Sequence, residues 1–166
     1  MSFTRKEVGN LVFNQSDGVI KHRVTNEDLA RFPVQFVVPV HLLAKSVSVA
    51  IDSTGVKESC GHFELPSEAL KHLSSAFLEA QADSPSATDA EVKVELYNET
   101  DGAVVASLTF SGAGGFTKSD DIASSLKGLA GKRLSGRINV TTASATSGAT
   151  QVFRSVVLVL IYDLTK

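Results

Sequence analysis

The stretch of this sequence that comes nearest to a catalytic motif is the glycine-rich segment Gly112–Ser119, which reads GAGGFTKS. It lies between an expected strand and an expected helix, and it departs from the phosphate-binding pattern G-x-x-x-x-G-K-S only at Thr117. The glycine normally found there lets the backbone approach a phosphate without a Cβ, whereas threonine is β-branched. A nucleotide-binding enzyme built on residues 112–119 is therefore a remote alternative, and we favour a flexible loop before a capped helix.

Metal ligation would have to draw on one cysteine and four histidines: Cys60, His22, His41, His62 and His72. Zinc requires three or four nitrogen or sulfur ligands that converge. Cys60 and His62 would share one strand face, but no second paired motif accompanies them. The pattern favours a buried thiol and surface histidines, so the sequence predicts no metal site and no cofactor.

Carboxylates and serines are plentiful, but no sequence motif fixes their positions relative to one another. Asp52, Asp101 and Asp163 follow expected strands and could join a calcium site in a carbohydrate-binding sandwich, but the D-x-D-x-D loop is missing. Glu91 and Glu95 fit an exposed strand face, and no G-x-S-x-G elbow occurs. Two tyrosines and no tryptophan leave no platform for stacking sugars. The sequence assigns no catalytic residue and favours a protein that is not an enzyme.

The amino-acid composition limits the classes of partner that this protein is expected to bind. The 166 residues are 43% hydrophobic and 20% charged with a net charge of −2, which is typical of one soluble domain spanning 1–166. No cluster of lysine and arginine is present to follow a phosphate backbone, so we expect no nucleic-acid binding. The N-terminal residues lack an apolar signal-peptide core, and the longest apolar run, 156–162, is far shorter than the roughly 20 residues of a membrane helix.

Three Asn-x-Ser/Thr triplets begin at Asn14, Asn98 and Asn139. Serine and threonine are so frequent here that at least one triplet is expected by chance. They are relevant only if the domain is displayed outside a cell, where such asparagines accept glycans.

The clearest structural element is a hairpin over residues 91–110. Val92, Val94 and Leu96 alternate with polar residues, which is the period of a strand with one buried face. Asp101-Gly102 supplies a turn, and residues 103–110 return with positions 104, 106, 108 and 110 on the apolar side. This hairpin requires more sheet to cover its apolar face.

Further strands are expected at 8–13, 19–24, 34–40, 45–52, 56–65, 134–142 and 152–162. The nearly continuous apolar run 34–40 predicts a strand buried on both faces or on the inside of a sandwich. Pro39 pushes this strand toward an edge of its sheet or toward its own end.

Two helices are expected besides a single helical turn between Asn26 and Pro33. The first begins at Pro66 and carries an apolar stripe through Ala80. The second is capped by residues 119–121 and ends with Gly131 in the C′ position. About eight strands with short connections and two helices indicate an all-β fold: an antiparallel β-sandwich, jelly-roll-like.

Residues 94–102 and 137–150 resemble archaeal β-sandwich domains, including jelly-roll proteins of turreted icosahedral archaeal viruses. The resemblance implies a structural role in a virion, as a capsid, penton-base or turret component. We therefore expect protein–protein contact and self-association into symmetric oligomers through edge strands and loops. A carbohydrate-binding β-sandwich module is the alternative.

Overall fold

The computed structural model describes residues 6–8, 11–14, 19–22 and 35–163. The chain divides into two compact units, one made of 1–35 with 163–166 and the other of 36–162. Each unit is described by itself. That one domain spans all 166 residues stays a prediction.

The described part of the first unit is a small antiparallel sheet in the order β1 (Lys6–Val8), β2 (Leu11–Asn14), β3 (Val19–His22). The strands β1 and β2 pair antiparallel, with Val8 opposite Leu11. The prediction of one strand over 8–13 was therefore wrong, because the apolar pattern does not reveal that two paired strands share this stretch. The helical turn expected between Asn26 and Pro33 lies outside the described residues.

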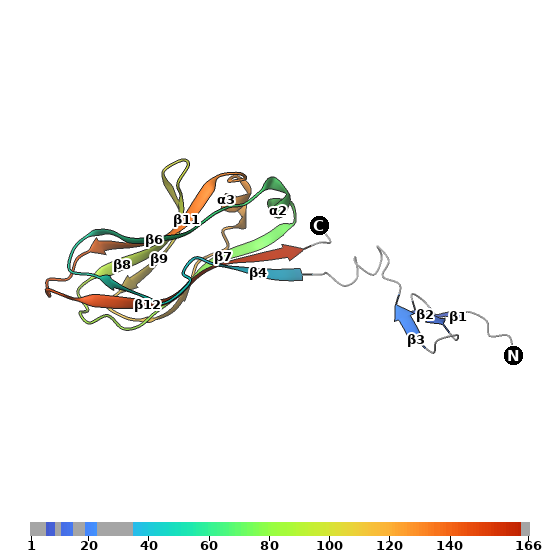
Figure 1. Ribbon diagram of the computed structural model, residues 1–166, viewed down its shortest axis with the longest axis horizontal. Coiled ribbons are helices and arrows are strands. Elements are labelled where there is room, and N and C mark those ends of the chain that lie inside the picture. Colours follow the sequence, from blue (N-terminus) through green and yellow to red (C-terminus); the bar gives the residue numbers. More distant parts are fainter. Residues whose placement is uncertain (1–5, 9–10, 15–18, 23–34, 164–166) are drawn as a thin grey trace. The chain divides into compact units, whose positions relative to one another are not determined.

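The remaining described strands form two antiparallel sheets, which confirms the predicted β-sandwich (Figure 1). The first sheet contains β4 (Gln35–His41), β5 (Val47–Ala50), β7 (Leu73–Ala82), β10 (Gly115–Lys118) and β12 (Thr150–Asp163). The second contains β6 (Gly55–Glu64), β8 (Glu91–Asn98), β9 (Ala103–Ser111) and β11 (Arg133–Thr142). Two short helices, α2 (Ser67–Lys71) and α3 (Ala123–Lys127), lie in the connections.

The strand order identifies a jelly roll. The first sheet runs β10-β7-β12-β4, with β5 also paired to β12, and the second runs β6-β11-β8-β9. When β4 and β5 are counted as one interrupted strand, the sandwich has eight strands in chain order. The first, third, sixth and eighth then form one sheet, and the second, fourth, fifth and seventh form the other. This arrangement is the jelly-roll topology expected from the sequence.

The core lies between the two sheets. Inward-facing residues of the hairpin strands and of β11 oppose those of β12, and Phe110 meets Phe153 edge-on with ring centroids 5.4 Å apart. Burial of each large apolar side chain contributes about 1.5–3 kcal/mol. Residues that are at most 2% exposed include Val92, Val94, Leu96, Leu134, Ile138, Val140, Phe153, Val156, Leu158 and Leu160. The predicted inward faces of 91–97, 134–140 and the last strand are thus confirmed, except at Val152, which is only partly buried.

The predicted first helix is largely a strand. Only α2, five residues long, is helical, and β7 begins at Leu73. Leu70, Leu73 and Ala80 fit a helical spacing, but Ala76, Leu78, Ala80 and Ala82 also fit the period of two, and they are the residues buried in β7. β7 is hydrogen-bonded to β10 on one side and β12 on the other, so sheet pairing overrides local helix propensity.

Two smaller predictions also fail for local reasons. Val104 was expected to face the core, but it is 51% exposed. The pairing shifts between Leu96, which faces Ala106, and Tyr97, which faces Val104, and one extra residue in β9 moves Val104 to the other face. Gly131 has a positive φ of 69°, but α3 ends four residues earlier at Lys127, so Gly131 is not its C′ residue.

Candidate functional site

Exposed apolar side chains concentrate at the edges of the two sheets. The edges of the first sheet are formed by β10 on one side and by β4 and β5 on the other, and those of the second sheet by β6 and β9. Every large apolar side chain that is exposed in the described part of the chain lies on one of these edge strands. They are Phe36, Val37 and Val38 on β4, Val56 on β6, Val104 on β9 and Phe116 on β10. Because exposed apolar groups on strand edges favour association, these positions form the candidate functional surface.

Strand β4 carries the largest share of this surface. Phe36, Val37 and Val38 are 49%, 62% and 42% exposed. The edge position that Pro39 suggested is confirmed, but the predicted burial on both faces is wrong. In Figure 1, β4 runs beside the C-terminal part of β12, at the end of the sandwich where α2 lies. Successive side chains of a strand point to opposite faces, so Val37 and its two neighbours expose apolar groups on both faces of β4.

The residues that follow β4 are anchored in the core. The backbone N–H of Leu42 donates to Val156 O at 2.8 Å, and Leu42 and Leu43 are 2% and 9% exposed. Leu42 packs against the backbone of the other sheet, where a Cβ on Gly61 or Gly136 would come within 2.7 or 2.9 Å of it. Two glycines therefore make room for one leucine, and this contact holds the exposed strand in place.

Pro39 limits how a partner can use the β4 edge. Pro39 lies within β4, at the edge of the first sheet. Proline has no N–H to donate, and within sheets it is found mainly on edge strands. A partner strand cannot receive a hydrogen bond from position 39, so contact through the side chains of Phe36, Val37 and Val38 is favoured.

The glycine-rich segment Gly112–Ser119 does not have the form of a phosphate-binding loop. Gly115–Lys118 is strand β10, in which Lys118 pairs with Glu79 of β7. A Cβ on Gly112 or Gly114 would come within 2.3 Å of neighbouring backbone, so these glycines serve close packing. The Lys118 ammonium lies 3.6 Å from the centre of the Phe77 ring. The lysine of the motif is therefore engaged in a side-chain contact.

The prediction that residues 119–121 cap the second helix was wrong, because the N-cap of α3 is Ile122, which makes no side-chain capping hydrogen bond. The neighbouring Asp121 nevertheless binds the first residue of the helix. Its Oδ1 accepts from the N–H of Ala123 at 2.9 Å and from the N–H of Ala76 in β7 at 3.0 Å. These two hydrogen bonds, that from Ala76 first, hold the pKa of the Asp121 carboxyl below its ordinary value. One carboxylate thus joins α3 to the central strand of the first sheet.

Cys60, His41, His62 and His72 form no group that could hold a metal ion. Cys60 packs partly against the core, and burial, with the nearby Glu58 charge as a second cause, raises the pKa of its thiol to about 11. His62 and His41 are exposed, and His72 follows α2. Nothing is described of the His22 side chain. Over the described ranges, no three histidine, cysteine or carboxylate side chains are grouped so that they could hold a metal ion.

The three aspartates considered for calcium have separate roles. Asp52 accepts from the Gly148 N–H at 2.9 Å, and Asp101 pairs with Lys132 at 3.0 Å. Asp163 is buried.

The asparagines of two of the Asn-x-Ser/Thr sites donate hydrogen bonds within the fold. Asn98 is 1% exposed and bonds within its own turn, where it donates to Asp101 at 2.7 Å. Asn139 is half-buried and donates to Glu95 at 3.3 Å. The surroundings of Asn14 are not described.

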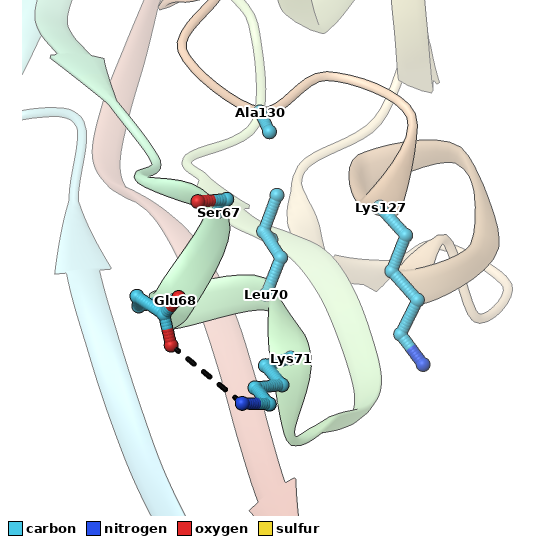
Figure 2. Close-up of a pocket in the computed structure, with 6 residues that line it drawn as sticks. All are labelled: Ser67, Glu68, Leu70, Lys71, Lys127 and Ala130. Carbon is cyan, nitrogen blue, oxygen red and sulfur yellow. Dashed lines mark ion pairs between the residues drawn. The ribbon is translucent and has the colours of Figure 1, made fainter.

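A shallow hollow of about 350 Å³ lies between α2 and α3 (Figure 2). Leu70 is directed toward Ala130 across it, and the only ion pair drawn joins Glu68 and Lys71 at 4.0 Å between well-exposed side chains. Such a pair contributes little and offers no catalytic arrangement. Within the described residues, no helix has the length and apolar content needed to cross a membrane.

The strand topology defines the general class of the chain, a jelly-roll β-sandwich, and comparisons with known proteins add no family to it. No family model matches it, and no curated protein matches it. The solved structures that are similar to it include a virus chain and an esterase chain. A chain in the structure of infectious bursal disease virus, Gx strain, is 12% identical with a TM-score of 0.46, and the match covers 78% of this chain. A family two carbohydrate esterase from Cellvibrio japonicus is 10% identical with a TM-score of 0.28 over 80% of this chain. This chain spans about a third of the length of each, 32% and 35%, and neither likeness assigns it a function.

Proposed function

We propose that this protein is a non-enzymatic structural module that acts by protein–protein contact and associates with further copies of itself. The observation that carries the proposal is the position of the large exposed apolar side chains. All of those in the described part of the chain lie on edge strands of the sandwich. A monomeric domain normally protects such edges with charges, with proline or by covering them. β4 has Pro39, which limits backbone pairing, but no Lys, Asp or Glu to keep a partner away from its apolar side chains.

The sandwich suits such a role because its sheets are fixed from within. The closely packed core leaves the edge strands as the variable surface, and Leu42 anchors the chain directly after the exposed part of β4. Association through one defined edge surface is compatible with closed symmetry, in which the same patch serves both partners. In the finer form of the proposal, the assembly is a virion, and the module is a capsid, penton-base or turret component.

Light scattering of the purified chain at increasing concentration tests the proposal. The wild type is expected to exceed the monomer mass, and F36S/V38S to remain monomeric, because this variant removes two large apolar groups from one face of β4. V37S alters the opposite face, so comparing the two variants shows which face is buried in the assembly.

The matched control is Q35S/H41S, which changes two exposed polar side chains at the ends of the same strand. It should associate like the wild type. A wild type that stays monomeric at all concentrations, or an F36S/V38S variant that associates as strongly as the wild type, would contradict the proposal.

A further inference from the structure

A second hollow, of about 390 Å³, is lined by His62 of β6, Glu99 and Thr100 of the β8–β9 turn, and Arg133 of β11. All four lining residues carry a polar or charged side chain, and none of them belongs to β4. Its volume is in the range of sites that hold small molecules.

Backbone hydrogen bonds fix the turn against β11. The N–H of Glu99 donates to the carbonyl of Arg133 at 2.8 Å, and the N–H of Arg133 donates to the Thr100 hydroxyl at 2.9 Å. Since both bonds use the backbone of residue 133, the Arg133 side chain can be replaced without removing them. The lining residues are thus held in place by the fold and do not depend on a ligand.

The Glu99 carboxylate is held in one orientation. It accepts from the Ser135 hydroxyl at 2.5 Å and from the Arg137 guanidinium at 3.0 Å. The Ser135 hydrogen bond, followed by Arg137, lowers the pKa of Glu99, so this carboxylate is ionised at neutral pH and keeps acceptor positions for a further donor. Ser135 is fully buried, which leaves it no route to a substrate as a nucleophile.

A bulge places the histidine beside this carboxylate. Between the pairs Phe63–Leu134 and Cys60–Gly136, β6 has two residues where β11 has only Ser135. Gly61 has a positive φ of 62°, which permits the extra residue. The extra residue shifts the alternation of side chains between the two faces of β6. As a result Cys60 packs toward the core while His62 lines the hollow. Bulges that redirect a side chain in this way are frequent next to functional sites.

We propose that this hollow binds a single acidic sugar residue, a hexuronic acid, through its carboxylate and its hydroxyl groups. The Arg133 guanidinium makes no hydrogen bond or ion pair with any other described residue, and its fork matches a carboxylate. Glu99 and Thr100 accept hydrogen bonds from sugar hydroxyls, and the imidazole of His62 contributes a further polar contact.

The ligand has to carry a charge because the hollow offers no aromatic face on which a neutral sugar could stack. Neutral sugars gain much of their affinity by packing on an aromatic face. The nearby Tyr97 ring is covered by the Arg137 guanidinium, 3.2 Å from its centre. Charge-assisted hydrogen bonds to a carboxylate therefore have to supply most of the affinity. None of the residues of this site belongs to β4, the strand on which the association test above rests.

Titration of the full chain with methyl β-D-glucuronide, followed by amide chemical shifts, tests the proposal. We expect saturable shifts at residues 62, 99–101 and 133. The neutral methyl β-D-glucoside and acetate should both bind at least about tenfold more weakly, because each lacks half of the recognised groups. R133Q should lower the affinity for the glucuronide about tenfold or more, as expected for loss of a charge-assisted pair.

The matched control is K127Q, which removes one positive charge at the hollow between α2 and α3 and should keep the wild-type affinity. F36S/V38S should also bind normally, which separates this site from the association surface. Absence of shifts at these amides, equal affinity for acetate, or equal loss in R133Q and K127Q would overturn the proposal.

Discussion

The two ends of one apolar segment have opposite surroundings. Phe36, Val37 and Val38 in β4 are exposed, whereas Leu42 and Leu43, a few residues later, are buried. Both groups are equally apolar in sequence. The difference is that the other sheet lies against Leu42, with Gly61 and Gly136 at the contact, while Phe36–Val38 lie on an edge strand with apolar groups exposed on both faces.

This contrast separates two uses of apolar residues in the same strand region. The buried end stabilises the fold, and the exposed end is available to a partner. Substitutions at the buried end should therefore alter the free energy of unfolding, and substitutions at the exposed end should alter association. The following predictions test this division, from the largest expected effect on stability to the smallest.

The largest loss of stability is expected for Leu42→Ala. Truncating a fully buried leucine removes its transfer free energy and leaves a cavity, which together cost about 2–5 kcal/mol. Denaturant unfolding, monitored by circular dichroism, measures the change. A loss of less than about 1 kcal/mol would show that Leu42 does not anchor the end of β4.

Gly136→Ala should cost somewhat less, about 1–3 kcal/mol, because the added methyl would lie 2.9 Å from the Leu42 Cβ. Gly128→Ala is the control: it has a helical φ of −78° and no heavy atom nearer than 3.6 Å, so its stability should be unchanged or slightly higher.

The double variant L42A/G136A sharpens this test. Alanine keeps the Cβ that lies 2.9 Å from the added methyl but loses Cδ1 and Cγ, at 3.1 and 3.5 Å. The freed space lets the remaining contact relax, so the combined loss should be smaller than the sum of the single losses. Additive losses would mean that Leu42 and Gly136 do not share the contact described here.

Asp121→Ala should cost about 1–2 kcal/mol at neutral pH, since it removes the hydrogen bonds to Ala76 and Ala123. The folded protein holds the pKa of Asp121 below its ordinary value of 3.8. Its contribution is therefore complete above that value and is lost as the pH falls through the lower, folded pKa. Unfolding midpoints measured at neutral and acidic pH should differ between wild type and variant only at neutral pH. A deficit that persists unchanged in acid would contradict this role.

The smallest effect on stability is expected for F36S/V38S, within about 0.5 kcal/mol of wild type, because these side chains are already half exposed. The comparison must be made at high dilution, where association does not add to stability. A large loss of stability under these conditions would mean that Phe36 and Val38 stabilise the fold and do not serve association alone.

The sequence predicts the sandwich well where local pattern and tertiary pairing agree. The hairpin strands β8 and β9 and the strands β11 and β12 follow the alternation of their residues. It fails in β7, where Leu70, Leu73 and Ala80 satisfy a helical spacing and only pairing with β10 and β12 decides for a strand. It also fails at Val104, because a bulge shifts the register without a glycine or proline to mark it.

The candidate sites were harder to predict from the sequence than the fold. Exposure of β4 depends on where the strand lies in the sheet, which its apolar composition does not reveal. His62, Glu99 and Arg133 are distant in the chain, and they share a hollow only because of the β6 bulge and the backbone bonds of the β8–β9 turn. The positive φ of Gly61 is the one local feature that could have marked the site, and glycine alone is a weak signal.

Amide hydrogen exchange across a range of protein concentrations tests most directly whether the exposed end of β4 is an association surface. Peptides covering residues 35–41 should become more protected as the concentration rises, while peptides from the buried strand β11 should not change. The protection should be absent in F36S/V38S and present in Q35S/H41S. Exchange in residues 35–41 that is independent of concentration in the wild type would contradict the account.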